Sequence, residues 1–183
     1  DFFLLAMDQL VNSAAKWHYM FGGLNSVPIT IRLIVGKGWG QGPTHSQSLQ
    51  SWFAHIPGLK VVMPALPSDA YNLLKTSIRD PNPVIFIEHR WLHNIKEEKL
   101  NIKPVKEKIT SQILSRGNHF TVVTYSLSTI EMLAMKDILN KNNIFFDLID
   151  LKSIKPLDLK LSERSVKRTK KLLILDSISH PIC

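Results

Sequence analysis

The sequence predicts an α/β fold of two successive domains, each with a mainly parallel sheet covered by helices. Short β-branched and aliphatic runs alternate with helical patterns in the order strand, helix, strand, and this order occurs twice. Between the two units, over residues 93–116, the apolar density falls and charges crowd together. We therefore expect a first domain over residues 1–92, a linker over 93–116 and a second domain over 117–183.

The first unit contains two helical patterns and three strand patterns. Strand runs are recognised by their β-branched residues, and the first helix by apolar side chains at helical spacing. Ser68 is the expected N-cap of the second helix, with Asp69 in its first turn. The first strand is expected to be buried. These patterns cover residues 2–16 and 68–79 for the helices, and 28–35, 59–63 and 83–88 for the strands.

The second unit repeats the alternation. Ser128 and Glu131 stand at capping-box spacing and predict the start of its first helix. A second helix is expected over residues 159–169. The strand patterns cover residues 120–125, 144–151 and 171–175. Both ends of the chain interrupt a pattern, so we expect a fragment that lacks an N-terminal part and a C-terminal end.

Composition excludes several classes of function. With 183 residues, 44% of them hydrophobic, the chain can build one large core or two modest ones. A single cysteine, Cys183, excludes an internal disulfide and a cysteine zinc cluster, and favours a reducing compartment. No apolar run approaches the ~20 residues that cross a bilayer, so no membrane partner is expected. The net charge of +8 gathers in residues 96–108 and 167–171, which we interpret as solvated or protein-docking surface without a nucleic-acid partner.

The loop after the first strand is the candidate site. Its glycines, over residues 36–42, match neither usual phosphate-binding fingerprint. Loops at the carboxyl ends of parallel strands are where open α/β sheets bind ligands. The loop presents His45, whose imidazole can exchange a proton near neutral pH or hydrogen-bond an oxyanion. A histidine packed in a polar turn is the alternative interpretation.

Two other polar clusters are weaker candidates. His89 and His93 stand at helical spacing where a strand pattern ends, which does not favour a metal site. Asp80 and Asn82 alternate with prolines and are typical of a turn, although their oxygens could coordinate a monovalent cation with nearby carbonyls.

Several motifs, in this order along nearly the whole chain, resemble the beta subunits of the thiamine-diphosphate-dependent pyruvate and branched-chain 2-oxoacid dehydrogenases, in the transketolase-like superfamily. The later motifs are similar to the transketolase C-terminal domain of those subunits. The motifs are Thr44-His45-Ser46-Gln47-Ser48, the run from Trp52 to Pro64, Ser77-Ile78-Arg79-Asp80-Pro81-Asn82-Pro83, Val122-Val123-Thr124-Tyr125-Ser126, Asp147 to Lys152, Lys155-Pro156-Leu157-Asp158 and Ser165 to Thr169.

The resemblance implies a pyrimidine-binding domain followed by a C-terminal domain. It implies thiamine diphosphate shared with an alpha subunit, which supplies the magnesium site, and a second beta subunit in the assembly. The implied reaction is decarboxylation of a 2-oxoacid substrate with acyl transfer to the lipoyl group of an acyltransferase core. The implied location is the cytoplasm of a bacterium or the mitochondrial matrix of a eukaryote.

The resemblance also assigns site residues. His45 matches the active-site histidine, and Phe2 stands where an aromatic ring meets the pyrimidine. The activating glutamate of the family would precede Asp1. Residues that align with a structural potassium site in some relatives are Ile29, Ser77, Ile78, Asp80 and Asn82.

Two alternatives stay open. One is a transketolase-like carboligase that acts on ketone donors, and the other is a non-catalytic docking subunit. The loop that carries Trp39 and the segment from Glu88 to His93 are bulkier than is usual in the family, which indicates an unusual substrate.

Overall fold

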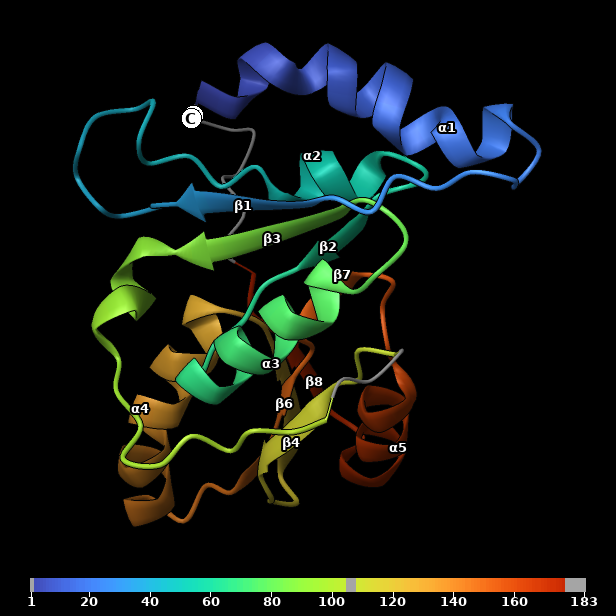
Figure 1. The fold of residues 1–183 in the computed structure, drawn as a ribbon. Helices are drawn as coiled ribbons and strands as arrows, with labels where there is room; N and C mark the ends of the chain where they lie inside the picture. Colours follow the sequence, from blue (N-terminus) through green and yellow to red (C-terminus); the bar gives the residue numbers. More distant parts are fainter. Residues whose placement is uncertain (1, 105–107, 177–183) are drawn as a thin grey trace.

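The computed structural model describes residues 2–104 and 108–176, which form two four-stranded sheets flanked by helices (Figure 1). No helix in these ranges is both long and apolar enough to cross a membrane. The predicted α/β class with two mainly parallel sheets is confirmed, because four of the six strand pairings are parallel.

The first sheet places three strands of the first unit beside one strand from the second half of the chain. β3 pairs in parallel with both β1 and β2, and Val35 lies opposite His89 where β1 and β3 end. β7 joins β2 antiparallel and was absent from the predicted elements. Across the sheet the strands are β1 (Thr30–Val35), β3 (Val84–His89), β2 (Lys60–Val62) and β7 (Ser153–Lys155).

The second sheet belongs to the second half of the chain. β5 pairs in parallel with β6 and β8, whereas β4 pairs antiparallel with β6. β4 comes from the segment that the sequence predicts as a linker, and the boundaries of the domains and of the linker stay a prediction. Across the sheet the strands are β4 (Gln112–Ser115), β6 (Phe146–Asp150), β5 (Phe120–Thr124) and β8 (Leu172–Ile174).

The helices cover both sheets, and Figure 1 shows α2 and α3 on opposite faces of the first sheet. The stretch predicted as one helix over residues 2–16 is helical throughout most of its length but irregular, with a 3₁₀ turn and a π segment before its α-helical end. The helical elements are η1 (Phe2–Ala6), η2 (Gln9–Ala14), α1 (Ala15–Met20), α2 (Gln50–His55), α3 (Pro67–Ile78), η3 (Arg90–Asn94), α4 (Leu127–Lys141) and α5 (Lys160–Thr169).

Both predicted N-caps were wrong. α3 begins at Pro67, a residue that suits the first helical position because it has no N–H to satisfy. Ser68 lies inside the first turn, where its N–H and hydroxyl donate to the Glu97 carboxylate. α4 has Ser126 as its N-cap, without a side-chain hydrogen bond, and Ser128 is buried in the first turn. A tertiary contact with Glu97 therefore replaces the capping role at Ser68.

Alternating side chains divide the core of the first sheet into two layers. Val61, Ile85 and Ile87 point to the α2 face, whereas Val62 and Phe86 point to the α3 face. All five are fully buried. By contrast β1, predicted as a buried strand, lies at the sheet edge, and Val35 is its only buried residue. Its β-branched composition indicated a strand correctly but did not reveal its edge position.

A buried polar cluster joins α3 to the second sheet. The Lys152 ammonium donates to one oxygen of Asp69 at 2.6 Å, and the Gln112 amide donates to the other at 2.6 Å. The same amide lies 3.3 Å from Asp150, which also accepts from Thr129 at 3.2 Å. Burial, and then repulsion from Asp69, raise the pKa of Asp150 to about 7, which Lys152 partly opposes. Asp150 therefore holds a proton over a pH range in which an exposed carboxyl is ionised.

Replacing Asp150 by asparagine should flatten the pH dependence of stability. Folding raises the pKa of Asp150, so between about pH 4 and pH 7 the folded state binds a proton that the unfolded state has released. The free energy of unfolding therefore falls as the pH rises through this range. Asp150→Asn keeps the shape and removes the titration. Urea unfolding of the purified protein at several pH values measures the slope. The exposed Asp137→Asn is the matched control, and an unchanged slope in Asp150→Asn would contradict the assignment.

Candidate functional site

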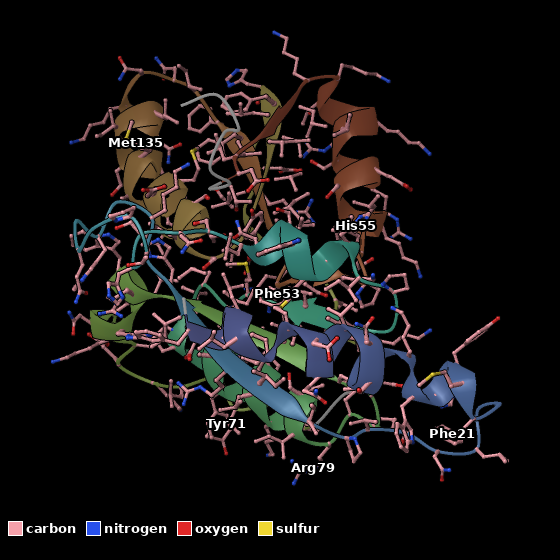
Figure 2. The ribbon with its side chains drawn as sticks, turned by 90° about the horizontal axis from the view of Figure 1, so that it is seen from above. Phe21, Phe53, His55, Tyr71, Arg79 and Met135 are labelled. Atoms are coloured by element: carbon pink, nitrogen blue, oxygen red, sulfur yellow. The ribbon has the colours of Figure 1, made fainter. Side chains whose placement is uncertain are left out.

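A cleft lies where the parallel strands β1 and β3 reach their carboxyl ends. Its volume is about 390 Å³, and its wall combines the N-terminal helical stretch, β1, the loop after β1 and α2. Phe2, Phe3 and Phe53 bring aromatic rings into a wall that also contains aliphatic side chains, and His45 and Arg90 bring polar groups into it. Phe53 is buried on α2, where Phe3 packs at a ring-centroid distance of 5.9 Å (Figure 2). Such a cleft suits a flat ring with a few polar atoms.

His45 sits in a loop that folds back on the end of β1. The Gly36 N–H donates to the Gln47 carbonyl at 3.4 Å, and the Gln47 amide donates to the Thr44 carbonyl at 3.1 Å. A methyl group at Gly36 would lie 2.6 Å from the His45 carbonyl oxygen. Only glycine therefore lets the loop approach the strand this closely. The loop fixes the backbone of His45 at the edge of the cleft.

Phe2 and His45, which the sequence predicts as the cofactor-binding and catalytic residues, lie together. Their ring centroids are 6.2 Å apart, with an interplanar angle of 70°, which is an edge-to-face contact. Phe2 is 76% exposed, so most of its ring is open to the cleft and to solvent. Their roles in binding and catalysis stay a prediction.

Arg90 lines the cleft, and a cluster of aromatic and polar side chains, which we call the rim, surrounds it. The rings of Trp39 and Trp91 meet edge to face at a centroid distance of 5.1 Å. The Arg90 guanidinium lies 5.3 Å from the Trp39 ring centroid. The Gln41 side-chain oxygen accepts from Arg90 at 3.3 Å and from the Trp39 indole at 3.2 Å. The bulky side chains of the Trp39 loop and of the segment from Glu88 to His93, which the sequence analysis noted, therefore lie together. Arg90 was not predicted as a site residue, because its hydrogen bond with Gln41 joins positions that are 49 residues apart in the sequence.

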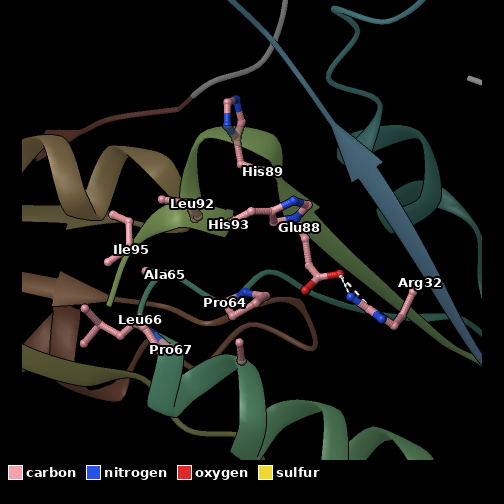
Figure 3. A pocket seen from close by; sticks show the side chains of 11 residues that line it. Arg32, Pro64, Ala65, Leu66, Pro67, Glu88, His89, Leu92, His93 and Ile95 are labelled. Atoms are coloured by element: carbon pink, nitrogen blue, oxygen red, sulfur yellow. Dashed lines mark hydrogen bonds and ion pairs between the residues drawn. The ribbon is translucent and has the colours of Figure 1, made fainter. Parts of the chain in front are cut away.

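A second cavity of about 330 Å³ lies on the other side of the strand ends (Figure 3). Arg32 of β1 donates to Glu88 of β3 at 2.6 Å, and the two side chains point toward one another. His89 is buried, and this burial lowers its pKa, which a backbone hydrogen bond at Lys37 partly opposes. In the described ranges no group of three histidine, cysteine or acidic residues could hold a metal ion.

The residues aligned with a potassium site gather around the turn between α3 and β3. Both oxygens of the Asp80 carboxylate are engaged, one by Lys60 at 2.5 Å and the other by the Asn82 backbone N–H at 2.9 Å. The Ser77 hydroxyl donates to the Leu73 carbonyl at 2.8 Å. The Ile29 carbonyl accepts from Val84 at 2.9 Å. A cation here would therefore rely on backbone carbonyls, each of which has a second lone pair. Its binding stays a prediction.

Residues 1–95 match the family model of the transketolase pyrimidine-binding domain, and residues 110–179 match the transketolase C-terminal domain. The chain belongs to the transketolase pyrimidine-binding domain family. This confirms the family that the sequence motifs indicated.

Named relatives point to one kind of subunit. The chain is 39% identical over 183 residues to the beta subunit of an acetoin:2,6-dichlorophenolindophenol oxidoreductase of Cupriavidus necator, covering 100% of this chain and 54% of that protein. It is 39% identical over 180 residues to a pyruvate dehydrogenase beta subunit of Rickettsia bellii, covering 96% and 54%. A mitochondrial pyruvate dehydrogenase beta subunit of Oryza sativa is 39% identical over 180 residues, with 96% and 48% covered. The chain spans about half the length of these curated relatives.

A solved structure titled split gene transketolase, inactive beta4 tetramer, has the same fold. Its TM-score is 0.76, and the match covers 95% of this chain and 53% of that chain. The identity is 19%, so this likeness supports the fold alone.

Gly36→Ala should displace His45 because the added methyl group meets the His45 carbonyl. Overpacking of this kind destabilises by about 1–3 kcal/mol. NMR signals of the His45 ring and urea unfolding measure both effects. Gly38→Ala is the control, since its methyl group meets no atom within 4 Å, although its φ of +78° adds strain of about 1 kcal/mol. Equal displacement of the His45 signals in both variants would contradict the close-approach explanation.

Proposed function

We propose that this chain is part of the beta subunit of a thiamine-diphosphate-dependent 2-oxoacid dehydrogenase. The observation that carries the proposal is the aromatic cleft beside His45, at the carboxyl ends of β1 and β3 of a pyrimidine-binding domain. The names of the two pyruvate dehydrogenase relatives support the same activity. The proposed reaction is the oxidative decarboxylation of a 2-oxoacid with transfer of the acyl group to lipoyl.

The cleft fits the aminopyrimidine part of thiamine diphosphate. Phe2 and Phe3 would meet the faces or edges of the ring, and Phe53 would close the bottom of the cleft. When bound, the cofactor supplies the carbanion chemistry that breaks the bond next to the keto group. His45 lies at the edge of the cleft and can hydrogen-bond or protonate an oxygen of the reacting acyl group.

The proposal includes other subunits. An alpha subunit would supply the diphosphate and magnesium site, a second beta subunit would complete the assembly, and a lipoyl acyltransferase core would receive the acyl group. Exposed apolar side chains along the N-terminal helical stretch support a covered surface there, with Leu5 91% and Tyr19 88% exposed. We place such an assembly in the bacterial cytoplasm, or in the mitochondrial matrix of a eukaryote.

His45→Ala should lower the turnover of the complete alpha and beta assembly by about 100-fold or more, because one positioned acid or base contributes on that order. Reductive acylation of a lipoyl domain and release of CO₂ measure the two halves of the reaction. His55 is exposed at the end of α2 (Figure 2), so His55→Ala is the matched control and should retain wild-type turnover. Wild-type rates in His45→Ala would remove His45 from the mechanism. Activity of the wild-type assembly on ketose phosphates alone would select a carboligase instead.

We also infer that potassium binds through the backbone carbonyls of Ile29, Ser77, Ile78, Asp80 and Asn82. The melting temperature should then be higher in potassium chloride than in sodium chloride at equal ionic strength, since a ligand that binds the folded state stabilises it. Ser77→Ala should retain this difference, because its carbonyl remains and its hydroxyl already donates to Leu73. Equal melting temperatures in the two salts would refute the site.

A further inference from the structure

We propose that Arg90 selects a 2-oxoacid with a second carboxylate at the end remote from its keto group. This inference rests on the function proposed above and deepens it by naming the substrate class. It follows from the place of Arg90 in the His45 cleft, from the neutral character of its partners and from the chemistry of a decarboxylation.

Arg90 is placed by the end of β3. It is the first residue of η3 and follows His89, which lies opposite Val35 at the last paired position of β1 and β3. Its side chain lines the same cleft as Phe2 and His45. A substrate that reacts beside His45 would therefore extend toward Arg90.

The two arginines of this cleft differ in their partners. Arg32 donates to the Glu88 carboxylate through two nitrogens, at 2.6 and 2.9 Å, so its charge is neutralised. Arg90 meets the Gln41 side-chain oxygen and the Trp39 ring, both of which are neutral. Its Nε is buried and has no hydrogen-bond partner among the described residues. Since a guanidinium stays protonated, the rim of the cleft holds a cation without a protein counter-ion in the described ranges.

A half-buried guanidinium of this kind favours an anionic ligand. Burying a charge without a counter-ion is unfavourable, and a carboxylate removes that cost while accepting two parallel hydrogen bonds. Trp39 holds the guanidinium from one side, and Trp91 holds Trp39 edge to face. The cation is therefore positioned before a substrate arrives.

The remote carboxylate is the better partner of Arg90 than the carboxylate next to the keto group. The latter loses its charge as it leaves as CO₂, so an ion pair with it would stabilise the substrate more than the transition state. A remote carboxylate keeps its charge throughout the reaction. Its ion pair with Arg90 contributes equally to both states and serves to bind and select the substrate.

The experiment compares matched substrates on the complete alpha and beta assembly. 2-Oxoglutarate and 2-oxopentanoate differ only at the remote end, which is a carboxylate in the first and a methyl group in the second. Two further pairs extend the comparison to other chain lengths: oxaloacetate with 2-oxobutanoate, and 2-oxoadipate with 2-oxohexanoate. For at least one pair, the wild type should prefer the dicarboxylate in kcat/KM by about 10- to 100-fold, the range that a hydrogen bond to a charged group provides.

Arg90→Gln should abolish that preference, mainly by raising KM for the dicarboxylate, while kcat/KM for the monocarboxylate changes by less than about threefold. Arg90→Lys keeps the charge without the fork, so it should retain part of the preference, and it substitutes for Arg90→Gln if the latter does not assemble. Arg164→Gln, an exposed arginine on α5, is the matched control and should change neither substrate.

Each contrary result has one meaning. The inference is overturned if the wild type prefers the monocarboxylate of every pair, or if Arg90→Gln lowers kcat/KM for both members of a pair alike. Arg90 would then have only a structural role beside Trp39, and the proposed function would stand. If no 2-oxoacid is decarboxylated by the wild-type assembly, the proposed function itself fails.

Discussion

The attachment of the second half of the chain to the first sheet is the constraint on which the rest of the structure depends. β7 pairs with β2, and next to it the Met63 N–H donates to the Lys152 carbonyl at 2.8 Å. Buried residues of both halves then share one core, in which Val61 and Met63 lie with Val123 and Ile149. Burial of each such side chain contributes about 1.5–3 kcal/mol, so the two sheets stabilise one another.

This attachment extends to the loop that carries His45. Gln50, at the start of α2, is buried and donates to the Tyr125 hydroxyl of the second half at 3.2 Å. At the other end of α2 the Lys155 ammonium donates to the carbonyls of Ala54 and Ile56, at 2.9 and 2.7 Å. A cation at a helix C-terminus satisfies carbonyls that have no partner within the helix. The helix that follows the His45 loop is thus held at both ends by residues of the other sheet.

Local patterns predicted what local forces determine. The β-branched run ending at Val35 and the apolar run ending at Glu88 indicated strands correctly, because strand propensity is high in both, and in the second burial agrees with it. β7 has three residues and exists because it pairs with β2, about 90 positions earlier, so no local pattern could reveal it. The same holds for Ser68, whose bond to Glu97 prevailed over the capping role that its position suggested.

The candidate site, too, could be predicted from the sequence only in part. His45 was predicted from its place in the loop after a strand and from the family resemblance, and Phe2 from the resemblance alone. Their physical surroundings were not visible in the sequence. The contact of Arg90 with Gln41 joins two segments that are separated by the whole of β2 and α3. Bulky side chains in both segments were the signal available, and they indicated an unusual site without revealing that the two segments meet.

The distribution of carboxylates explains why the cleft keeps a positive charge. Asp69, Asp80, Asp147 and Glu88 each bind a cationic side chain within the described residues. Glu88 follows Ile87, whose side chain lines the cleft, so the Glu88 side chain turns to the opposite face of β3, because successive residues of a strand face opposite ways. It neutralises Arg32 there. In the part of the chain that the structure describes, no acidic residue lines the His45 cleft, so the potential inside it favours an anion.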